Sequence, residues 1–161
     1  MTDVGLPVQA VGTAGYGIIE FSYDAAGRVR MKTDQQGDTC TFTYNLGGQL
    51  LSRAYRTRAN SPSGTVADSD TFTYDRAGRM LTALSGRYAN TVTLAYDHAG
   101  RLASEGLTIA GQTYSVGRTY DVRGLEATLS YPGGGVVQRT YTPRRQLQQT
   151  SYLGAVVEST I

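Results

Sequence analysis

Tyrosine, aspartate, glycine and arginine recur together in this 161-residue chain, and they are the residues best suited to chemistry. A tyrosine ring can stack on a sugar, while carboxylate and guanidinium groups can hydrogen-bond sugar hydroxyls. The alternative interpretation is structural: ring packing, a turn cap, a bulge and a cross-strand ion pair. We favour the structural interpretation because it fits every copy. The set comprises Tyr23, Asp24, Gly27, Arg28, Tyr44, Asn45, Gly48, Tyr74, Asp75, Gly78, Arg79, Tyr96, Asp97, Gly100, Arg101, Tyr120, Asp121, Gly124 and Tyr141.

The other reactive side chains form no catalytic constellation. His98, the single histidine, lies in a predicted turn, and one histidine argues against a histidine-built metal site. Cys40, the single cysteine, shares an apolar strand side with Phe42, so we expect a buried small hydrophobe and no disulfide. Gly133 to Gly135 lacks the Lys-Ser/Thr of a phosphate loop. The sequence therefore predicts no enzyme, no catalytic residue, no cofactor and no metal site.

Charge and hydropathy narrow the range of partners. The net charge of +2 is too small to indicate nucleic acid, and no apolar run reaches the 18 or more residues of a membrane helix. We interpret Arg56-Thr57-Arg58 and Arg144-Arg145 as solvated loop charge. Met1 to Gly17 contains no visible signal peptide. Glycosylation of Ser and Thr in the 57–73 loop is left open.

The Asp-x-x-Gly sequence between two alternating runs predicts a hairpin turn. Aspartate can accept a hydrogen bond from the backbone two residues on, and glycine can adopt the left-handed conformation. A type I turn followed by such a glycine is a common hairpin loop with a bulge. This geometry places each aspartate opposite the arginine four residues later. It also pairs tyrosines with aliphatic residues: Tyr23 with Val29, Tyr44 with Leu50, Tyr74 with Met80, Tyr96 with Leu102 and Tyr141 with Leu147.

The repeat organises most of the chain. Its tyrosines lie 21, 30, 22, 24 and 21 residues apart, and the long interval indicates a loop insertion at 56–69. Glycine is frequent, with 20 residues, and only 40% of residues are hydrophobic, which favours many short elements over one thick core. We therefore predict residues 1–17 as an N-terminal extended segment and residues 18–161 as an array of about six repeat hairpins.

Alternation of residue types predicts an apolar side on each strand. Cys40, Phe42 and Tyr44 share one side, as do Val92, Leu94 and Tyr96, and we expect Met80, Thr82 and Leu84 to share another. The chain is expected to reverse again at Ser85-Gly86, at Ala110-Gly111 and at Pro132 to Gly135. The predicted fold class is all-β: repeated antiparallel β-hairpins that form a curved, stacked sheet.

The recurring Tyr-Asp-x-x-Gly-Arg-aliphatic motif resembles the YD repeat, also called the RHS repeat. This family includes bacterial RHS and wall-associated proteins, the BC components of Tc toxins, and teneurins. The resemblance covers roughly Ile18 to Tyr152. It implies hairpins that coil into a large β-walled shell, commonly around a toxic C-terminal segment, and it implies an extracellular or cell-surface location.

Several positions depart from the family pattern. Asn45 replaces aspartate in the second copy, and the fifth copy has Leu125 and Glu126 where arginine and an aliphatic residue are expected. The sixth copy has Thr142 for aspartate, Pro143 inside the turn and Arg145 for glycine, which puts its bulge in doubt. Arg118 and Arg139 stand where earlier copies have Phe or Leu, so we expect either that the later repeats lie near an end or an opening, or that these arginines line a polar interior or a contact.

Three functions follow from these observations. In the first, the chain is a non-enzymatic wall segment of an RHS-type shell or surface scaffold, with further YD repeats as its partners. In the second, it is a subunit of an extracellular filament built by docking of identical copies. In the third, it is an adhesion module that binds glycans along the tyrosine stripe.

Overall fold

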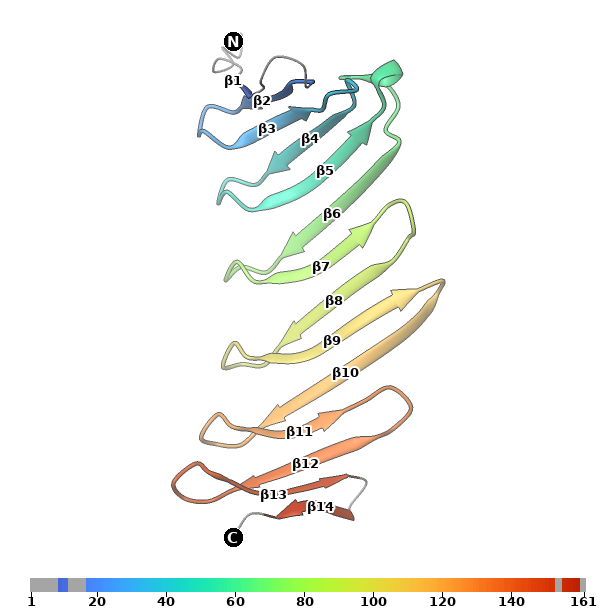
Figure 1. Ribbon diagram of the computed structural model, residues 1–161. Helices are drawn as coiled ribbons and strands as arrows, with labels where there is room; N and C mark the ends of the chain where they lie inside the picture. The colour runs from blue at the N-terminus through green and yellow to red at the C-terminus, as the bar shows by residue number, and fades with distance from the viewer. Residues whose placement is uncertain (1–8, 12–16, 153–154, 160–161) are drawn as a thin grey trace. The chain divides into compact units, whose positions relative to one another are not determined.

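The computed structural model describes residues 9–11, 17–152 and 155–159, and it divides the chain into two units, residues 1–89 and 90–161. Each unit is an antiparallel sheet whose strands follow one another in sequence order (Figure 1). This confirms the all-β hairpin fold. In the first unit the strands are Gln9–Val11 (β1), Ile19–Tyr23 (β2), Val29–Thr33 (β3), Thr39–Tyr44 (β4), Leu50–Arg56 (β5), Asp68–Tyr74 (β6) and Met80–Ser85 (β7). In the second they are Thr91–Tyr96 (β8), Leu102–Ile109 (β9), Gln112–Tyr120 (β10), Glu126–Ser130 (β11), Val136–Tyr141 (β12), Leu147–Tyr152 (β13) and Ala155–Ser159 (β14).

The predicted tyrosine pairing is confirmed in every repeat for which it was made. Tyr23 lies opposite Val29 and Tyr44 opposite Leu50, and the other three pairs follow the same spacing. In each hairpin the register shifts at the tyrosine, which is the signature of the predicted bulge. Gly27, Gly48 and Gly78 have φ between 77° and 83°, the left-handed conformation that the turn requires.

The bulge also corrects one prediction about strand sides. Met80 pairs with Tyr74, but Thr82 pairs with Thr73 because the bulge takes up one residue between them. Thr82 and Leu84 therefore lie on the opposite side from Met80, and Ala83 is the residue that faces Phe72. Simple alternation fails whenever it is counted across a bulge.

The sixth turn forms despite its unfavourable sequence. Thr142 N donates to Gln146 O and Arg145 N donates to Thr142 O, both at 2.9 Å, as in the other repeats. Arg145 adopts φ 67° in the place of glycine. The sequence placed this bulge in doubt, and that doubt was wrong. The left-handed conformation costs a non-glycine residue some conformational energy, but neighbouring contacts can hold the residue in it.

Three of the turns at the other ends of the strands were predicted from the sequence, and one was not. Residues 86–88, 110–111 and 132–134 form turns, as predicted. The turn between β3 and β4 was not recognised, although Asp34 and Gly37 repeat the Asp-x-x-Gly chemistry. Asp34 Oδ1 accepts hydrogen bonds of 2.9 Å from the backbone N–H groups of Gln36 and Asp38.

The insertion between β5 and β6 runs from 57 to 67, because Arg56, Asp68 and Ser69 belong to the flanking strands. It contains a short 3-10 helix, Arg58–Asn60 (η1). The N-terminal segment predicted for residues 1–17 lies mostly outside the described residues, and the domain division stays a prediction.

Neither unit has a thick core among the residues that the structure describes. Cys40, 9% exposed, is the buried hydrophobic residue, and no large side chain in this part of the chain is fully buried. Most strand residues are half-buried on a single sheet layer. Contacts between neighbouring strands and turns must therefore supply most of the stability.

Candidate functional site: contacts between successive turns

The aspartate of the repeat organises its own turn. Asp75 Oδ1 accepts hydrogen bonds of 2.9 Å from the backbone N–H groups of Ala77 and Arg79. Asp75 Oδ2 accepts a bond of 2.7 Å from Arg79 Nε and lies 2.6 Å from Arg79 Nη2. The same four distances recur at Asp24 and at Asp97. The predicted pairing of aspartate with arginine is thus a bidentate ion pair.

These contacts lower the carboxylate pKa. The side-chain hydrogen bond from arginine is the largest cause of the lowered pKa at Asp24 and Asp97. At Asp75 and Asp121 the largest cause of the lowered pKa is a backbone hydrogen bond, donated by Arg79 and Leu125 respectively. All four carboxylates therefore stay ionised to a lower pH than an aspartate without such contacts.

Four of the repeat tyrosines, two in each unit, reach back to the preceding hairpin. Tyr44 OH donates to Val29 O at 2.9 Å, and Tyr74 OH donates to Leu50 O at 2.9 Å. In the second unit Tyr120 OH donates to Leu102 O, and Tyr141 OH donates to Glu126 O, both at 2.8 Å. The accepting carbonyl belongs each time to the residue that follows the preceding turn's arginine position.

The tyrosine hydroxyl contacts a part of the preceding hairpin that lies outside the pairing between the two neighbouring strands. Strands β3 and β4 pair from Thr33 opposite Thr39 to Met31 opposite Thr41. Val29 lies two residues beyond the last of these pairs. The Tyr44 hydroxyl therefore adds a side-chain hydrogen bond to Val29 O at a position beyond the last paired residues of β3 and β4.

The residue at the arginine position completes the contact in the forward direction. The Arg28 guanidinium lies 4.7 Å from the centre of the Tyr44 ring, and its Nη1 donates to Asn45 O at 3.2 Å. Arg101 lies 4.3 Å from the centre of the Tyr120 ring. Gln49 holds this position in the second repeat, and its Nε2 donates to Gly78 O at 2.7 Å. We call the reach-back hydroxyl together with this forward contact the turn latch.

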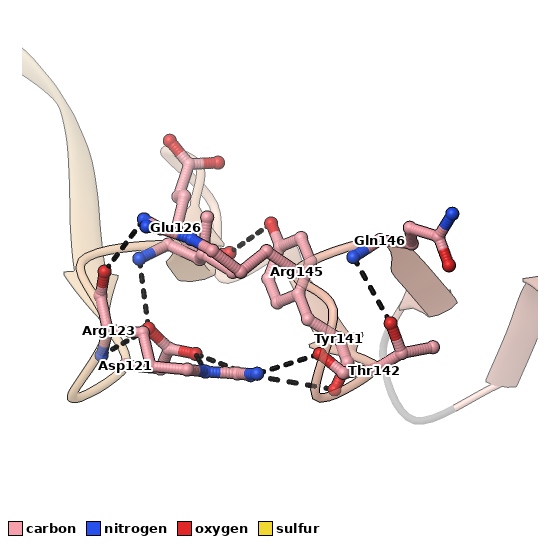
Figure 2. Close-up of polar contacts among 8 residues, drawn as sticks. Asp121, Arg123, Glu126, Tyr141, Thr142, Arg145 and Gln146 are labelled. Atoms are coloured by element: carbon pink, nitrogen blue, oxygen red, sulfur yellow. Dashed lines mark hydrogen bonds and ion pairs between the residues drawn. The ribbon is translucent and has the colours of Figure 1, made fainter.

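The fifth repeat keeps its latch by moving the arginine. Leu125 occupies the usual arginine position, and Arg123, two residues earlier, pairs with Asp121 at 2.9 Å instead. Arg123 Nη1 donates to Thr142 O at 2.7 Å, and Arg145 Nη2 returns a bond of 3.0 Å to Arg123 O (Figure 2). The sequence did not predict this role of Arg123, because the residue lies two positions after the turn aspartate, where the repeat motif has no fixed residue type.

The charged departures of the late repeats compensate one another. Glu126, which replaces the aliphatic residue, is paired with both Arg118 and Arg139. The Arg118 Nε to Glu126 Oε2 distance is 3.6 Å. The expectation that these arginines sit at a contact holds, and the contact is a carboxylate from the intervening strand.

The isolated residues singled out from the sequence lie apart from the latch. His98 is exposed in its turn. Cys40 is buried beside Tyr55, and burial raises the pKa of its thiol, which opposes thiolate chemistry. Among the described residues no group of three metal-ligating side chains occurs, and no helix there has the length and apolarity to cross a membrane.

Comparison with known proteins gives similarity to solved structures alone. No protein-family model matches the chain, and no curated protein does. The TcdB2-TccC3 crystal structure is 19% identical with TM-score 0.46, over 89% of this chain and 11% of that one. The Photorhabdus luminescens Tc holotoxin pore with a TccC3 mutation is 17% identical with TM-score 0.44, over 89% and 10%. A porin-like protein from Bacteroides uniformis is 12% identical with TM-score 0.36, over 90% and 74%. The chain spans about a tenth of the length of the TccC3-containing chains.

Proposed function

We propose that this chain is a non-enzymatic structural repeat protein, a β-hairpin wall segment of an RHS-type secreted or surface protein. The observation that carries the proposal is the turn latch. In the described residues, a tyrosine hydroxyl joins successive repeats at all four repeat junctions inside the two units. The recurring tyrosines therefore serve to hold one hairpin to the next.

The distribution of polar groups supports a wall over an enzyme. Each repeated carboxylate is already occupied by backbone donors and by an arginine, which leaves it poorly placed for proton transfer. The partners of such a segment are further YD repeats in the same polypeptide, in an extracellular setting.

The first test of this proposal is to read the genomic DNA on both sides of the segment that encodes this chain. A wall segment requires Tyr-Asp-x-x-Gly-Arg repeats that continue in frame on at least one side. Expression of the extended frame, followed by electron microscopy, should then show closed hollow particles. In-frame stop codons at both ends, or filaments formed by this chain alone, would contradict the wall and favour the self-assembling fibre.

A further inference from the structure

The hairpin of β9 and β10, in the second unit, extends beyond the neighbouring strand β11 (Figure 1). Strand β10 pairs with β9 from Gln112 to Gly117. Its pairing with β11 begins only at Gly117, opposite Ser130, where β11 ends and the chain turns. Among the described residues of this unit, none pairs with the stretch from Gln112 to Val116 on the β11 side. We call this stretch the open edge of β10.

The open edge presents backbone groups that have no strand partner. The chain reverses between β9 and β10 through Ala110 at φ 49° and Gly111 at φ 80°. The N–H and C=O groups of an antiparallel strand point alternately to its two edges, and a two-residue turn directs those of the flanking residues at each other. Counting from Gln112, the groups of Thr113 and Ser115 therefore point to the open edge and can pair with another strand.

The open edge lacks the features with which proteins protect a free strand. Those features are charged side chains, proline and bulges. The sequence between Glu105 and Arg118 contains no charged residue and no proline, and the register shift of β10 lies beyond Arg118. Tyr114, in the middle of the edge, is 52% exposed, and Leu107, which lies opposite it on β9, is 38% exposed. An uncharged edge with exposed apolar side chains favours the addition of a further strand.

The order of side chains along the open edge fits a second copy of the same segment. Two copies related by a two-fold axis run antiparallel, with Tyr114 opposite Tyr114 and Thr113 of each copy opposite Ser115 of the other. In this register the outward N–H and C=O groups of Thr113 and Ser115 face one another and can exchange hydrogen bonds. The sheet already contains this side-chain pair, because Thr43 lies opposite Ser52 with their hydroxyl oxygens 2.7 Å apart.

From these observations we infer that the chain forms a two-fold dimer in which the open edges of two β10 strands pair. The two Tyr114 rings lie next to each other on one face of the joined sheet, with Leu107 of each copy alongside, and the contact shields them from water. The contact is isologous, so it closes after two copies and builds no filament. Because few residues of each copy take part, the dimer is weak and reversible. The inference does not depend on the wall function.

Analytical ultracentrifugation of the full chain tests the dimer. Sedimentation equilibrium over about 10 to 500 µM should show a monomer–dimer equilibrium whose dissociation constant lies within that range. A chain that stays monomeric at every concentration, or that associates beyond the dimer, would overturn the inference.

The variants Tyr114→Lys and Tyr114→Glu test the register. Each alone places like charges opposite each other at the two-fold axis and should weaken dimerisation at least about tenfold. Both should keep the urea midpoint of the parent chain, because the residue is exposed in the monomer. An equimolar mixture should dimerise again, since lysine then faces glutamate. Tyr88→Lys, at a tyrosine 64% exposed in a turn of the first unit, is the matched control and should dimerise normally. Undiminished dimers in both single variants, or no recovery in the mixture, would refute this pairing.

Tyr114→Cys tests the same contact without added charge. Residues directly opposite at a non-hydrogen-bonded position have Cα atoms about 4.5 Å apart, which is within the range that a disulfide spans. Mild oxidation should therefore cross-link this variant into covalent dimers, whereas Tyr88→Cys should stay monomeric under the same conditions. Cys40 is buried and should not contribute. Equal cross-linking of the two variants would contradict the dimer.

Discussion

At the scale of single residues, the tyrosine hydroxyl is the contact that distinguishes this repeat from an isolated hairpin. The ring alone would pack equally well in phenylalanine, yet four hydroxyls each cap a carbonyl of the preceding repeat. The preference for tyrosine over phenylalanine at these positions therefore has a hydrogen-bonding cause.

Tyr74→Phe tests this cause. The variant keeps the ring but leaves Leu50 O without its donor, so we expect the free energy of unfolding to fall by about 1 kcal/mol. Urea denaturation measures the change. Tyr88→Phe is the control, because Tyr88 is 64% exposed in a loop and its change should be negligible. Equal effects of the two variants would contradict a role for the hydroxyl.

The turn carboxylates predict how stability depends on pH. Their folded-state pKa values lie below 3.8, the ordinary value, so their stabilisation is fully present above the unfolded pKa. It is lost as the pH falls through the folded pKa values. We expect the urea midpoint to be level from about pH 7 to pH 5 and to drop below about pH 4.

Asp97→Asn isolates one of these groups. Asparagine keeps the turn acceptor, as Asn45 does with Gln49 N at 3.0 Å, but it cannot titrate. The variant should be less stable at pH 7 and should lose less stability on acidification. An acid-induced drop as large as that of the wild type would show that other groups carry the pH dependence.

At the scale of elements, the hairpins follow from the sequence because their causes are local. A tyrosine, an Asp-x-x-Gly turn and an aliphatic residue six positions after the tyrosine fix the register without help from the rest of the chain. The junctions between hairpins could not be predicted in the same way. The reach of Tyr120 to Leu102, and the displaced role of Arg123, depend on which strand lies alongside.

Arg145→Gly tests the cost of the sixth turn. Arginine at φ 67° is held in a left-handed conformation that costs about 1 kcal/mol relative to glycine, and its bond to Arg123 O is exposed. We expect a net stabilisation of up to about 1 kcal/mol in urea denaturation. Gly78→Ala makes the opposite change. Alanine at φ 83° should lower the free energy of unfolding by about 1 to 2 kcal/mol.

The displaced arginine can be tested by returning it to its usual position. Arg123→Ala removes the ion pair with Asp121 and the bond to Thr142 O, and should cost about 1 kcal/mol. Adding Leu125→Arg should restore part of the loss. Arg76→Ala, at an exposed turn position, is the control and should change little. Failure of Leu125→Arg to rescue would show that the fifth turn differs from the others in more than this side chain.

At the scale of the whole molecule, each unit has a single sheet layer in its described residues in place of the usual interior. Among the described residues the buried hydrophobic side chain is that of Cys40, so stability accumulates from neighbour to neighbour within each unit. The sequence indicated this arrangement through its low hydrophobic content and its period, because no segment supplies enough apolar residues for a second layer.

Cys40 provides a probe of the first unit. The side chain is 9% exposed and burial raises its thiol pKa, so labelling by a thiol reagent at pH 8 should be slow. We expect labelling at least about a hundredfold slower than in urea-unfolded chain, limited by local opening. Tyr74→Phe should accelerate it, because the latch between β5 and β6 lies in the same unit. Labelling at the unfolded rate would mean that the first unit is open in solution.

The latched turns and the 57–67 insertion lie at opposite ends of the strands they join (Figure 1). Extra residues at the unlatched ends leave the tyrosine register untouched, as the insertion itself demonstrates with normal latches on either side. Those ends are natural grafting sites. An epitope or an affinity tag spliced into the short turn at Ala110 and Gly111 should be displayed without disturbing the array.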